Sequence, residues 1–242
     1  MQHINLDEKW CFRRGMLDSV GMLQWDPGEL VNLPHDGMIH LDVTKEAPAQ
    51  YDSGYYPGDT RYVMIPREWE RDLVGLQFDG VMMHTSIDVN GCKVGEHHYG
   101  YSPFYVDLTD YVTFGEENRI TINVNTGVQP SSRWYTGSGL FRGVTLCHSP
   151  RVFILPDGIN VVTREVTEHI AFLEAQVEIG NETLENHMVE VKVELWKEGE
   201  PEEKAVAEAR RMIEVGKNNR ETARISIHLS DPVLWDAENP NL

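Results

Sequence analysis

The sequence predicts an all-β protein built from two sandwich domains in tandem. Three observations lead to this prediction: apolar and polar residues alternate in several segments, an Asn-Gly turn joins two of these segments, and the composition changes near residues 148–158. The alternation of strands and helices that a parallel sheet requires is not visible. We therefore expect antiparallel sheets packed face to face, in a larger domain at residues 1–152 and a smaller one at 153–242.

Four segments show the alternation clearly, with aliphatic residues at every second position and polar residues between them. They are residues 120–124, 173–179, 189–195 and 225–229. Successive side chains of a strand point to opposite faces, so each segment predicts a strand with one buried and one wet face.

A tight turn is predicted at Asn90-Gly91, between residues 87–89 and 92–95. Asn and Gly tolerate the positive φ angles of a type I′ turn, which is the commonest two-residue connection of a β-hairpin. The domain break rests on Pro150 and Pro156, which flank a short apolar segment, and on the lower frequency of Trp and Tyr after it. The remaining 90 or so residues are near the size of an immunoglobulin-like sandwich.

The charge excludes some classes of partner. The chain has 39 acidic and 21 basic residues and a formal net charge of -18. A field of this sign repels phosphate backbones and anionic membrane surfaces, so we expect neither nucleic acid nor membrane as a partner. It is compatible with a neutral ligand such as a sugar, and also with a charge that serves solubility alone.

The lack of a visible targeting signal and the pattern of cysteines favour a cytosolic protein. No apolar run approaches the roughly 18 residues of a membrane span, and residues 1–9 lack the pattern of a secretory signal. Cys11, Cys92 and Cys147 are an odd number without metal-like spacing, which is typical of reduced thiols.

The sequence contains no complete catalytic machinery. Its ten histidines include the pair His97-His98 but show no metal-ligand spacing, and neither a nucleophile elbow nor a phosphate or dinucleotide loop is present. We therefore expect no metal and no cofactor. Asp79 and Asp107 are predicted to accept hydrogen bonds at turns or strand ends.

One segment, residues 129–139, combines polar, aromatic and glycine residues and follows a strand that ends at Asn125, so we expect a long exposed loop. Arg133, Trp134 and Tyr135 within it suit a sugar, because aromatic faces stack on C–H surfaces and a guanidinium donates to hydroxyls. The alternative is that Trp134 and Tyr135 cap the core and Arg133 pairs with an acid.

An ordered series of short motifs over residues 51–150, preceded by a Pro-His-Asp element, resembles a known family. The motifs are Pro34-His35-Asp36, Phe78-Asp79-Gly80-Val81, Val89-Asn90-Gly91, Tyr99-Gly100-Tyr101-Ser102-Pro103-Phe104 and Ser138-Gly139-Leu140-Phe141-Arg142-Gly143. Together they resemble the sugar-binding jelly-roll domain of glycoside hydrolase family two, which contains β-galactosidases, β-glucuronidases and β-mannosidases. The form of the loop at residues 130–135 is similar to that of β-galactosidase-type members.

The rest of the chain extends the resemblance. Residues after 155 resemble the immunoglobulin-like second domain of the family, and residues 232–242 its closing signature. The implied fold is a galactose-binding-like jelly-roll β-sandwich followed by an immunoglobulin-like β-sandwich. The family's catalytic (β/α)₈ barrel, which carries both catalytic glutamates, would follow and is absent, so we expect a truncated chain.

Some positions depart from the family pattern. Gly37 stands where an aromatic residue is usual, and residues 60–64 replace the usual Trp-Tyr-Arg. The acidic metal-contacting loop of some β-galactosidases is not matched, so no metal is carried over. For segment 202–215, helix propensity favours a helix, but Pro201, Gly216, the flanking strands and the resemblance favour a strand.

The resemblance implies a parent enzyme that hydrolyses terminal β-linked sugars, galactose above all, with retention of configuration. This chain would be inactive alone and would pack on its own C-terminal barrel. Arg133 would reach the sugar, Trp134 and Tyr135 would shape the pocket wall, and His35 and Asp36 would be structural. Two alternatives remain open: a free-standing carbohydrate-binding module, and a scaffold for a homo-oligomer interface.

Overall fold

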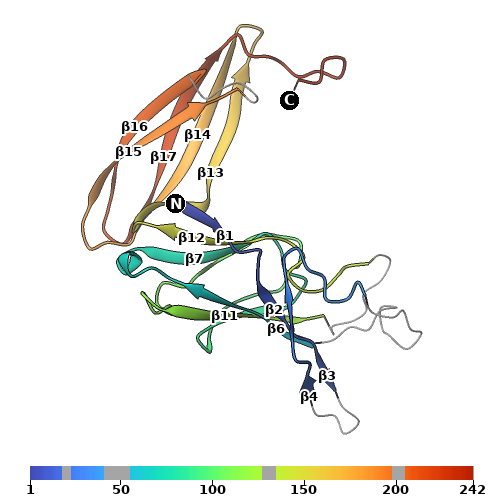
Figure 1. The fold of residues 1–242 in the computed structure, drawn as a ribbon. Coiled ribbons are helices and arrows are strands. Elements are labelled where there is room, and N and C mark those ends of the chain that lie inside the picture. The colour runs from blue at the N-terminus through green and yellow to red at the C-terminus, as the bar shows by residue number, and fades with distance from the viewer. Residues whose placement is uncertain (18–22, 41–54, 127–134, 198–204, 242) are drawn as a thin grey trace. The chain divides into compact units, whose positions relative to one another are not determined.

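The structure, a computed structural model, describes residues 1–17, 23–40, 55–126, 135–197 and 205–241. The chain divides into two compact units, Met1–Pro150 and Arg151–Leu242. Within the described residues every regular element is a strand, apart from one 3₁₀ turn, η1, at Arg67–Trp69 (Figure 1). The all-β class is therefore confirmed, and the division of the chain lies close to the predicted boundary after residue 152.

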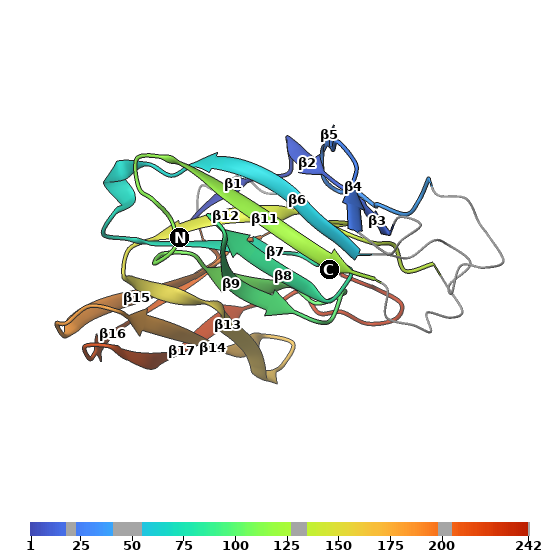
Figure 2. The same cartoon turned by 90° about the horizontal axis from the view of Figure 1, so that it is seen from below.

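The first unit is a sandwich of two antiparallel sheets. Its strands are β1 (Gln2–Asn5), β2 (Trp10–Phe12), β3 (Gly15–Leu17), β4 (Leu23–Trp25), β5 (Glu29–Val31), β6 (Tyr55–Met64), β7 (Leu73–Phe78), β8 (Thr85–Val89), β9 (Cys92–His97), β10 (Phe104–Asp107), β11 (Glu117–Asn125) and β12 (Val144–Ser149). One sheet has the order β1-β12-β7-β10 and the other β5-β2-β6-β11-β8-β9, while β3 and β4 form a separate hairpin. Figure 2 shows β6, β11, β8 and β9 side by side in the larger sheet.

Alternation along β11 explains why this sequence forms a sandwich. Ile120, Ile122 and Val124 are all buried, while the residues between them are partly or fully exposed. They join one apolar cluster with Phe78 and Leu76 of β7 in the opposite sheet. The predicted strand at residues 120–124 is confirmed, and its apolar face lies between the two sheets.

The predicted hairpin turn is also confirmed. Asn90 and Gly91 have φ angles of 52° and 87°, and Val89 pairs with Cys92 across the turn. The Asn90 side chain donates to Oδ1 of the buried Asn118 over 2.8 Å, which ties the turn to the start of β11. This arrangement positions β9 as the last strand of the larger sheet.

The second unit consists of β13 (Val152–Val166), β14 (Ile170–Asn181), β15 (His187–Leu195), β16 (Ala207–Val215) and β17 (Asn219–Ser230). The strands form a three-stranded sheet, β13-β14-β17, and a two-stranded sheet, β15-β16. The three strands predicted in this half lie within β14, β15 and β17. Buried residues from both sheets form its core: Ala175, Val177, Ile179, Val191, Val215, Ala223, Ile225 and Ile227.

Part of segment 202–215 tests the choice between helix and strand. Residues 207–215 form β16, so the preference for a strand is confirmed there, while residues 202–204 lie outside the described residues. The core-facing residues Ala207, Ala209, Ile213 and Val215 follow the two-residue period of a strand, which is interrupted at the exposed Arg211. Pairing with β15 and burial of this face outweigh the helix propensity of the composition.

Two further observations bear on the sequence predictions. All three cysteines are free, with Cys92 exposed and Cys147 buried. Across the described part of the chain, no helix has the length and apolar character to cross a membrane.

A buried asparagine closes one end of the second unit. Asn181, which is 1% exposed, donates from Nδ2 to the carbonyl oxygens of Glu185, Val215 and Gly216 at 2.8–3.1 Å. Its Oδ1 accepts from the backbone N–H and the hydroxyl of Thr183. One side chain therefore fastens the end of β14 to the start of the loop before β15 and to the end of β16.

Replacing this residue is expected to destabilise the second unit. Asn181→Ala should lower the free energy of unfolding by about 2–3 kcal/mol, because buried carbonyl groups lose their donor. Asn160→Ala, at an exposed position on β13, is the matched control and should change it by less than about 0.5 kcal/mol. Urea unfolding measures both, and equal losses in the two variants would contradict the role given to Asn181.

Candidate functional site

Three segments that are distant in sequence meet beyond the end of β11. The backbone of residues 35–37 bonds to residues 138–140, through Gly37 N–H to Ser138 O and His35 N–H to Leu140 O, both at 2.9 Å. Gly139 in turn exchanges two hydrogen bonds with Met82, at 2.7 and 3.0 Å. We call these three segments, residues 35–38, 82–83 and 135–140, the loop frame.

The loop frame adjoins the segment predicted to contact a sugar. Arg133 and Trp134 lie outside the described residues, so their predicted roles are untested. Tyr135 is described and is 40% exposed. Its hydroxyl group donates a hydrogen bond to Oδ2 of Asp36, which lies 99 positions earlier in the chain. The structure thus joins one predicted sugar-contacting residue to one predicted structural residue.

Asp36 is the central acceptor of the loop frame. Its Oδ1 accepts from the backbone N–H of Met38 at 2.9 Å and of Ser138 at 3.0 Å, and its Oδ2 accepts from Tyr135. A carboxylate that receives several N–H or O–H groups forms charge-assisted bonds, which are stronger than neutral ones. Asp36 therefore braces two loops against each other.

The approach of Asp36 depends on a glycine. Gly137 has a φ angle of +73°, in the region that favours glycine, and a Cβ at this position would lie 2.9 Å from Asp36 Oδ2. Any other residue at position 137 would push the carboxylate away from Tyr135.

A second carboxyl group, Asp59 of β6, is buried beside the frame. It is 4% exposed, the backbone N–H of Leu140 donates to it, and its Oδ1 has no hydrogen-bond partner among the described residues. Burial raises the pKa of Asp59 to about 7, and the Leu140 hydrogen bond only partly opposes this. Near neutral pH this carboxyl group therefore exchanges between its neutral and charged forms.

The Asp59 site was missed by sequence reasoning, although a signal exists. Val63 and Ile65 of the same segment are buried, and counting back in steps of two through Arg61 places Asp59 on the same inward face. An acid at a core-facing position of a strand is unusual, because burying its charged form costs free energy.

Other polar groups are buried near the same strands. Thr85 Oγ1 and His35 Nδ1 also lack partners among the described residues, and Thr126 and Ser138 are buried together with their hydroxyl oxygens 3.3 Å apart. Burial lowers the pKa of His35, against the opposing influence of the Glu29 and Asp36 charges. The His35 ring also packs edge-on against the buried Phe12, with ring centroids 4.6 Å apart, which is a structural role.

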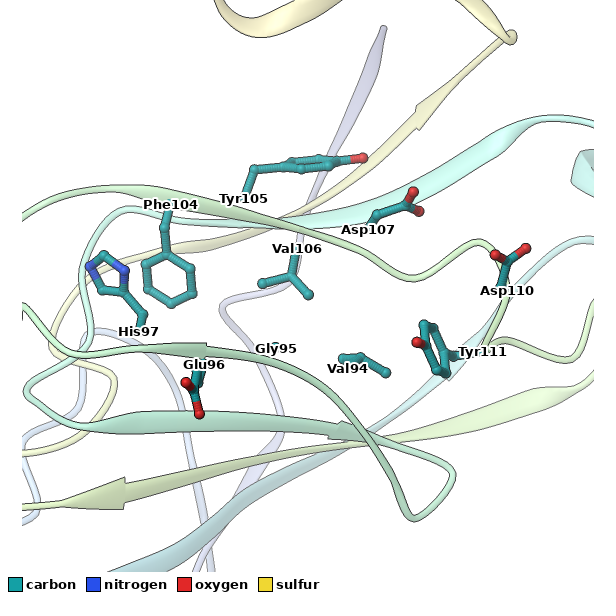
Figure 3. A pocket seen from close by; sticks show the side chains of 10 residues that line it. All are labelled: Val94, Gly95, Glu96, His97, Phe104, Tyr105, Val106, Asp107, Asp110 and Tyr111. Atoms are coloured by element: carbon teal, nitrogen blue, oxygen red, sulfur yellow. The ribbon is translucent and has the colours of Figure 1, made fainter. Parts of the chain in front are cut away.

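A groove of about 450 Å³ lies along the side of the first unit (Figure 3). It is lined by residues 94–97 of β9, residues 104–107 of β10, and Asp110 and Tyr111 of the following turn. β9 and β10 are the last strands of their respective sheets, so the groove follows the open edge of the sandwich.

In these places carboxylates accept hydrogen bonds that hold loops and turns in position. Across the described ranges, no three His, Cys, Asp or Glu side chains are grouped so as to hold a metal ion. Asp107 accepts from the N–H and hydroxyl of Thr109 at 2.9 and 2.7 Å, which confirms its predicted turn role.

Comparisons with known proteins agree with this architecture. The sequence profile described as "Glycosyl hydrolases family 2, sugar binding domain" matches residues 38–150, and the profile "Glycosyl hydrolases family 2" matches residues 157–242. These two ranges fall within the first and second units respectively.

Individual relatives point the same way. A β-galactosidase of Bacteroides ovatus is 32% identical over 219 residues, which cover 88% of this chain and 25% of the relative. A β-glucuronidase of Bacteroides fragilis is 29% identical over 196 residues, covering 74% of this chain and 26% of the relative. The chain thus spans about a quarter of the length of these curated relatives.

Solved structures show the same fold. A glycosyl hydrolase family 2 member from Bacteroides cellulosilyticus aligns with a TM-score of 0.85 and 25% identity, covering 99% of this chain and 33% of that one. A β-glucuronidase of Bacteroides uniformis aligns with a TM-score of 0.81 at 22% identity, over 98% of this chain and 29% of that one. The jelly-roll and immunoglobulin-like sandwiches predicted from the sequence are confirmed.

Removing the Asp59 carboxyl group should change how stability depends on pH. The folded pKa of about 7 lies above the ordinary value of 3.8. The contribution of the protonated Asp59 to the free energy of unfolding is therefore fully present below pH 4 and is lost as the pH rises through 7. About three pH units correspond to a loss of the order of 4 kcal/mol. Asp59→Asn should therefore be more stable than the wild type at pH 8–9, and this advantage should be smaller at pH 5.

Urea unfolding of both proteins across this pH range measures the difference. Asp110→Asn, which removes an exposed carboxylate, should run parallel to the wild type. If the difference between Asp59→Asn and wild type stayed constant from pH 5 to pH 9, the raised pKa of Asp59 would be wrong.

Loss of the Asp36 brace should loosen the loop frame locally. In Asp36→Ala the amide groups of Met38 and Ser138 lose a charge-assisted bond of about 1.5–3 kcal/mol each. Hydrogen exchange at these two amides should accelerate at least about tenfold, since 1.4 kcal/mol is a factor of ten. Exchange at Ile120 in the core strand should be unchanged, and unaltered exchange at Met38 and Ser138 would refute the brace.

Proposed function

Because the chain belongs to glycosyl hydrolase family 2, we propose that it is the non-catalytic N-terminal region of a retaining β-glycosidase that removes terminal β-linked galactose. The acid and the nucleophile of such an enzyme would lie in a catalytic barrel that follows these residues. The chain would pack on that barrel and supply one wall of the sugar pocket.

The order of the two family matches carries this proposal. A profile of the sugar-binding domain covers residues 38–150 and a second profile of the same family covers residues 157–242, in line with the two sandwiches. Retaining glycosidases need two carboxyl groups about 5 Å apart in a cleft that holds the sugar ring. Among the described residues, Asp107 is a turn acceptor, Asp36 forms the brace and Asp59 is a buried carboxyl group without a second carboxyl group shown beside it.

Galactose is favoured over glucuronate as the sugar. The relatives include proteins named β-galactosidase and others named β-glucuronidase, and the relative that is 32% identical is a β-galactosidase. The net charge of -18 also favours a neutral substrate, because a uronate carboxylate is repelled by a field of this sign.

Three residues of the loop would carry the contribution to the pocket. Arg133 would donate hydrogen bonds to sugar hydroxyls, and Trp134 and Tyr135 would shape the wall. The Asp36 brace supports this role, because it engages the Tyr135 hydroxyl and anchors the chain that follows. A cytosolic location is proposed on cysteine usage alone.

The test compares the full-length gene product with this chain. The full-length protein should hydrolyse p-nitrophenyl β-D-galactoside faster than the corresponding β-D-glucuronide, and residues 1–242 alone should release no nitrophenol. Arg133→Ala in the full-length protein should lower kcat/KM by about 10–100-fold, the value of one or two lost charged hydrogen bonds.

Arg119→Ala is the control, since Arg119 lies at an exposed position on β11. It should leave kcat/KM within a factor of about two. Turnover by residues 1–242 alone would refute the claim that the active site lies elsewhere, and a preference for the glucuronide would refute the choice of sugar.

A further inference from the structure

One side of the second unit leaves aliphatic side chains uncovered. Ile154, Ile159 and Val161 of β13 are 44%, 59% and 49% exposed. Each lies directly opposite a buried residue of β14, and side chains in directly opposite positions share one face of a sheet. These partners are Ile179, Val177 and Ala175, none more than 3% exposed. The same face of the sheet is therefore buried at β14 and open at β13.

The opposing sheet is too narrow to cover this face. It consists of β15 and β16 alone and lies against a sheet of three strands. Arg211 of β16 donates to the carbonyl oxygen of Arg224 of β17 at 2.6 Å, so β16 lies over β17. Val191 of β15 is buried in the cluster that contains the core residues of β14. Figure 1 shows β13 on the side of the unit away from β16, and no described strand pairs with the remaining edge of β15.

The two sides of this sandwich differ in chemistry. On the side of β16, Arg211 occupies a core-facing position opposite Val191, and an inward-pointing charge is one way in which proteins prevent a further strand from adding to an edge. On the side of β15, the core-facing residues are all aliphatic: Val189, Val191, Val193 and Leu195. A free edge with such a face suits an added strand, whose backbone supplies hydrogen bonds and whose alternate side chains supply packing.

The architecture and the length of the relatives identify the source of the strand. An immunoglobulin-like sandwich has at least about seven strands, whereas the described sheets of the second unit have three and two. The matched residues cover 25% of the β-galactosidase of Bacteroides ovatus, so the longer enzyme proposed above has ample chain to supply more. A strand tethered within the same polypeptide also binds at a high effective concentration, which a second copy lacks.

We propose that the uncovered side between β13 and β15 receives a β-strand from a later part of the same polypeptide, which pairs with the free edge of β15 and packs aliphatic side chains on Ile154, Ile159 and Val161. The second unit is then complete only in the longer protein. This inference rests on the proposed function for the existence of that longer protein, and it depends neither on the sugar nor on hydrolysis.

The test compares amide hydrogen exchange in the full-length gene product and in residues 1–242, followed by mass spectrometry. Amides on the free edge of β15 have no strand partner in residues 1–242, so part of segment 187–195 should exchange rapidly there. In the full-length protein, exchange of this part should slow at least about 100-fold, because the added strand accepts hydrogen bonds from these amides. The protection should be unchanged on tenfold dilution, since the strand belongs to the same molecule.

A matched pair of variants tests the packing. Ile159→Ser in the full-length protein should speed exchange in segment 187–195 at least about tenfold, because the added strand loses a buried aliphatic contact. In residues 1–242 the same change should alter exchange by less than about twofold, since the side chain is already exposed there. Leu184→Ser, at a position 80% exposed in the loop before β15, is the control and should have no effect in either protein. Exchange in β11 reports whether each variant is folded.

The proposal is overturned if segment 187–195 exchanges equally in the two proteins, or if Ile159→Ser and Leu184→Ser have equal effects in the full-length protein. Protection that disappears on dilution would assign the site to a second copy and would also overturn it. Every readout is an exchange rate. A full-length protein that hydrolyses no galactoside would therefore refute the proposed function and leave this result interpretable.

Discussion

Burial of alternate strand residues between two sheets is the constraint on which this molecule depends. In β11 every second residue faces the opposite sheet, and Trp10 of β2 is fully buried with its indole N–H bonded to the carbonyl oxygen of Leu6 at 2.6 Å. Because a strand has a period of two, a shift of one residue would send this whole face into water. The register fixed by this burial also decides where the strands end and where the loops emerge.

Two features of the first unit follow from that register. Beyond the end of β11, the loop frame is held by Asp36, by the close approach at Gly137 and by backbone bonds between distant segments. Along the open side, β9 and β10 end different sheets and leave the groove between them. In both places the rigid sandwich positions polar side chains on loops or at a sheet edge.

Much of the fold could be predicted because its signals are local. Alternation identified β11, β14, β15 and β17, Asn90-Gly91 identified the hairpin, and Asp107 was correctly predicted to accept hydrogen bonds in a turn. Segment 202–215 shows the limit of composition, since its residues favour a helix while pairing with β15 makes residues 207–215 a strand. There the tertiary contact outweighs the local preference.

The candidate sites were less predictable because they depend on contacts between distant segments. The bond between Tyr135 and Asp36 joins positions 99 residues apart, and the groove arises from the order of strands in two sheets. For Asp59 the sequence shows only that it lies an even number of residues before the buried Val63 and Ile65. That the backbone of Leu140 donates to it could not be known from the sequence. Arg133 and Trp134 lie outside the described residues, so their contact with sugar stays a prediction.

Covalent trapping of the full-length protein would show where its nucleophile lies. A galactose-configured, mechanism-based inhibitor attaches to the nucleophile of a retaining glycosidase, and peptide mass spectrometry then locates the attachment. We expect the modified residue to be a glutamate encoded after Leu242, with residues 1–242 recovered unmodified. Attachment to any residue between Met1 and Leu242 would contradict it.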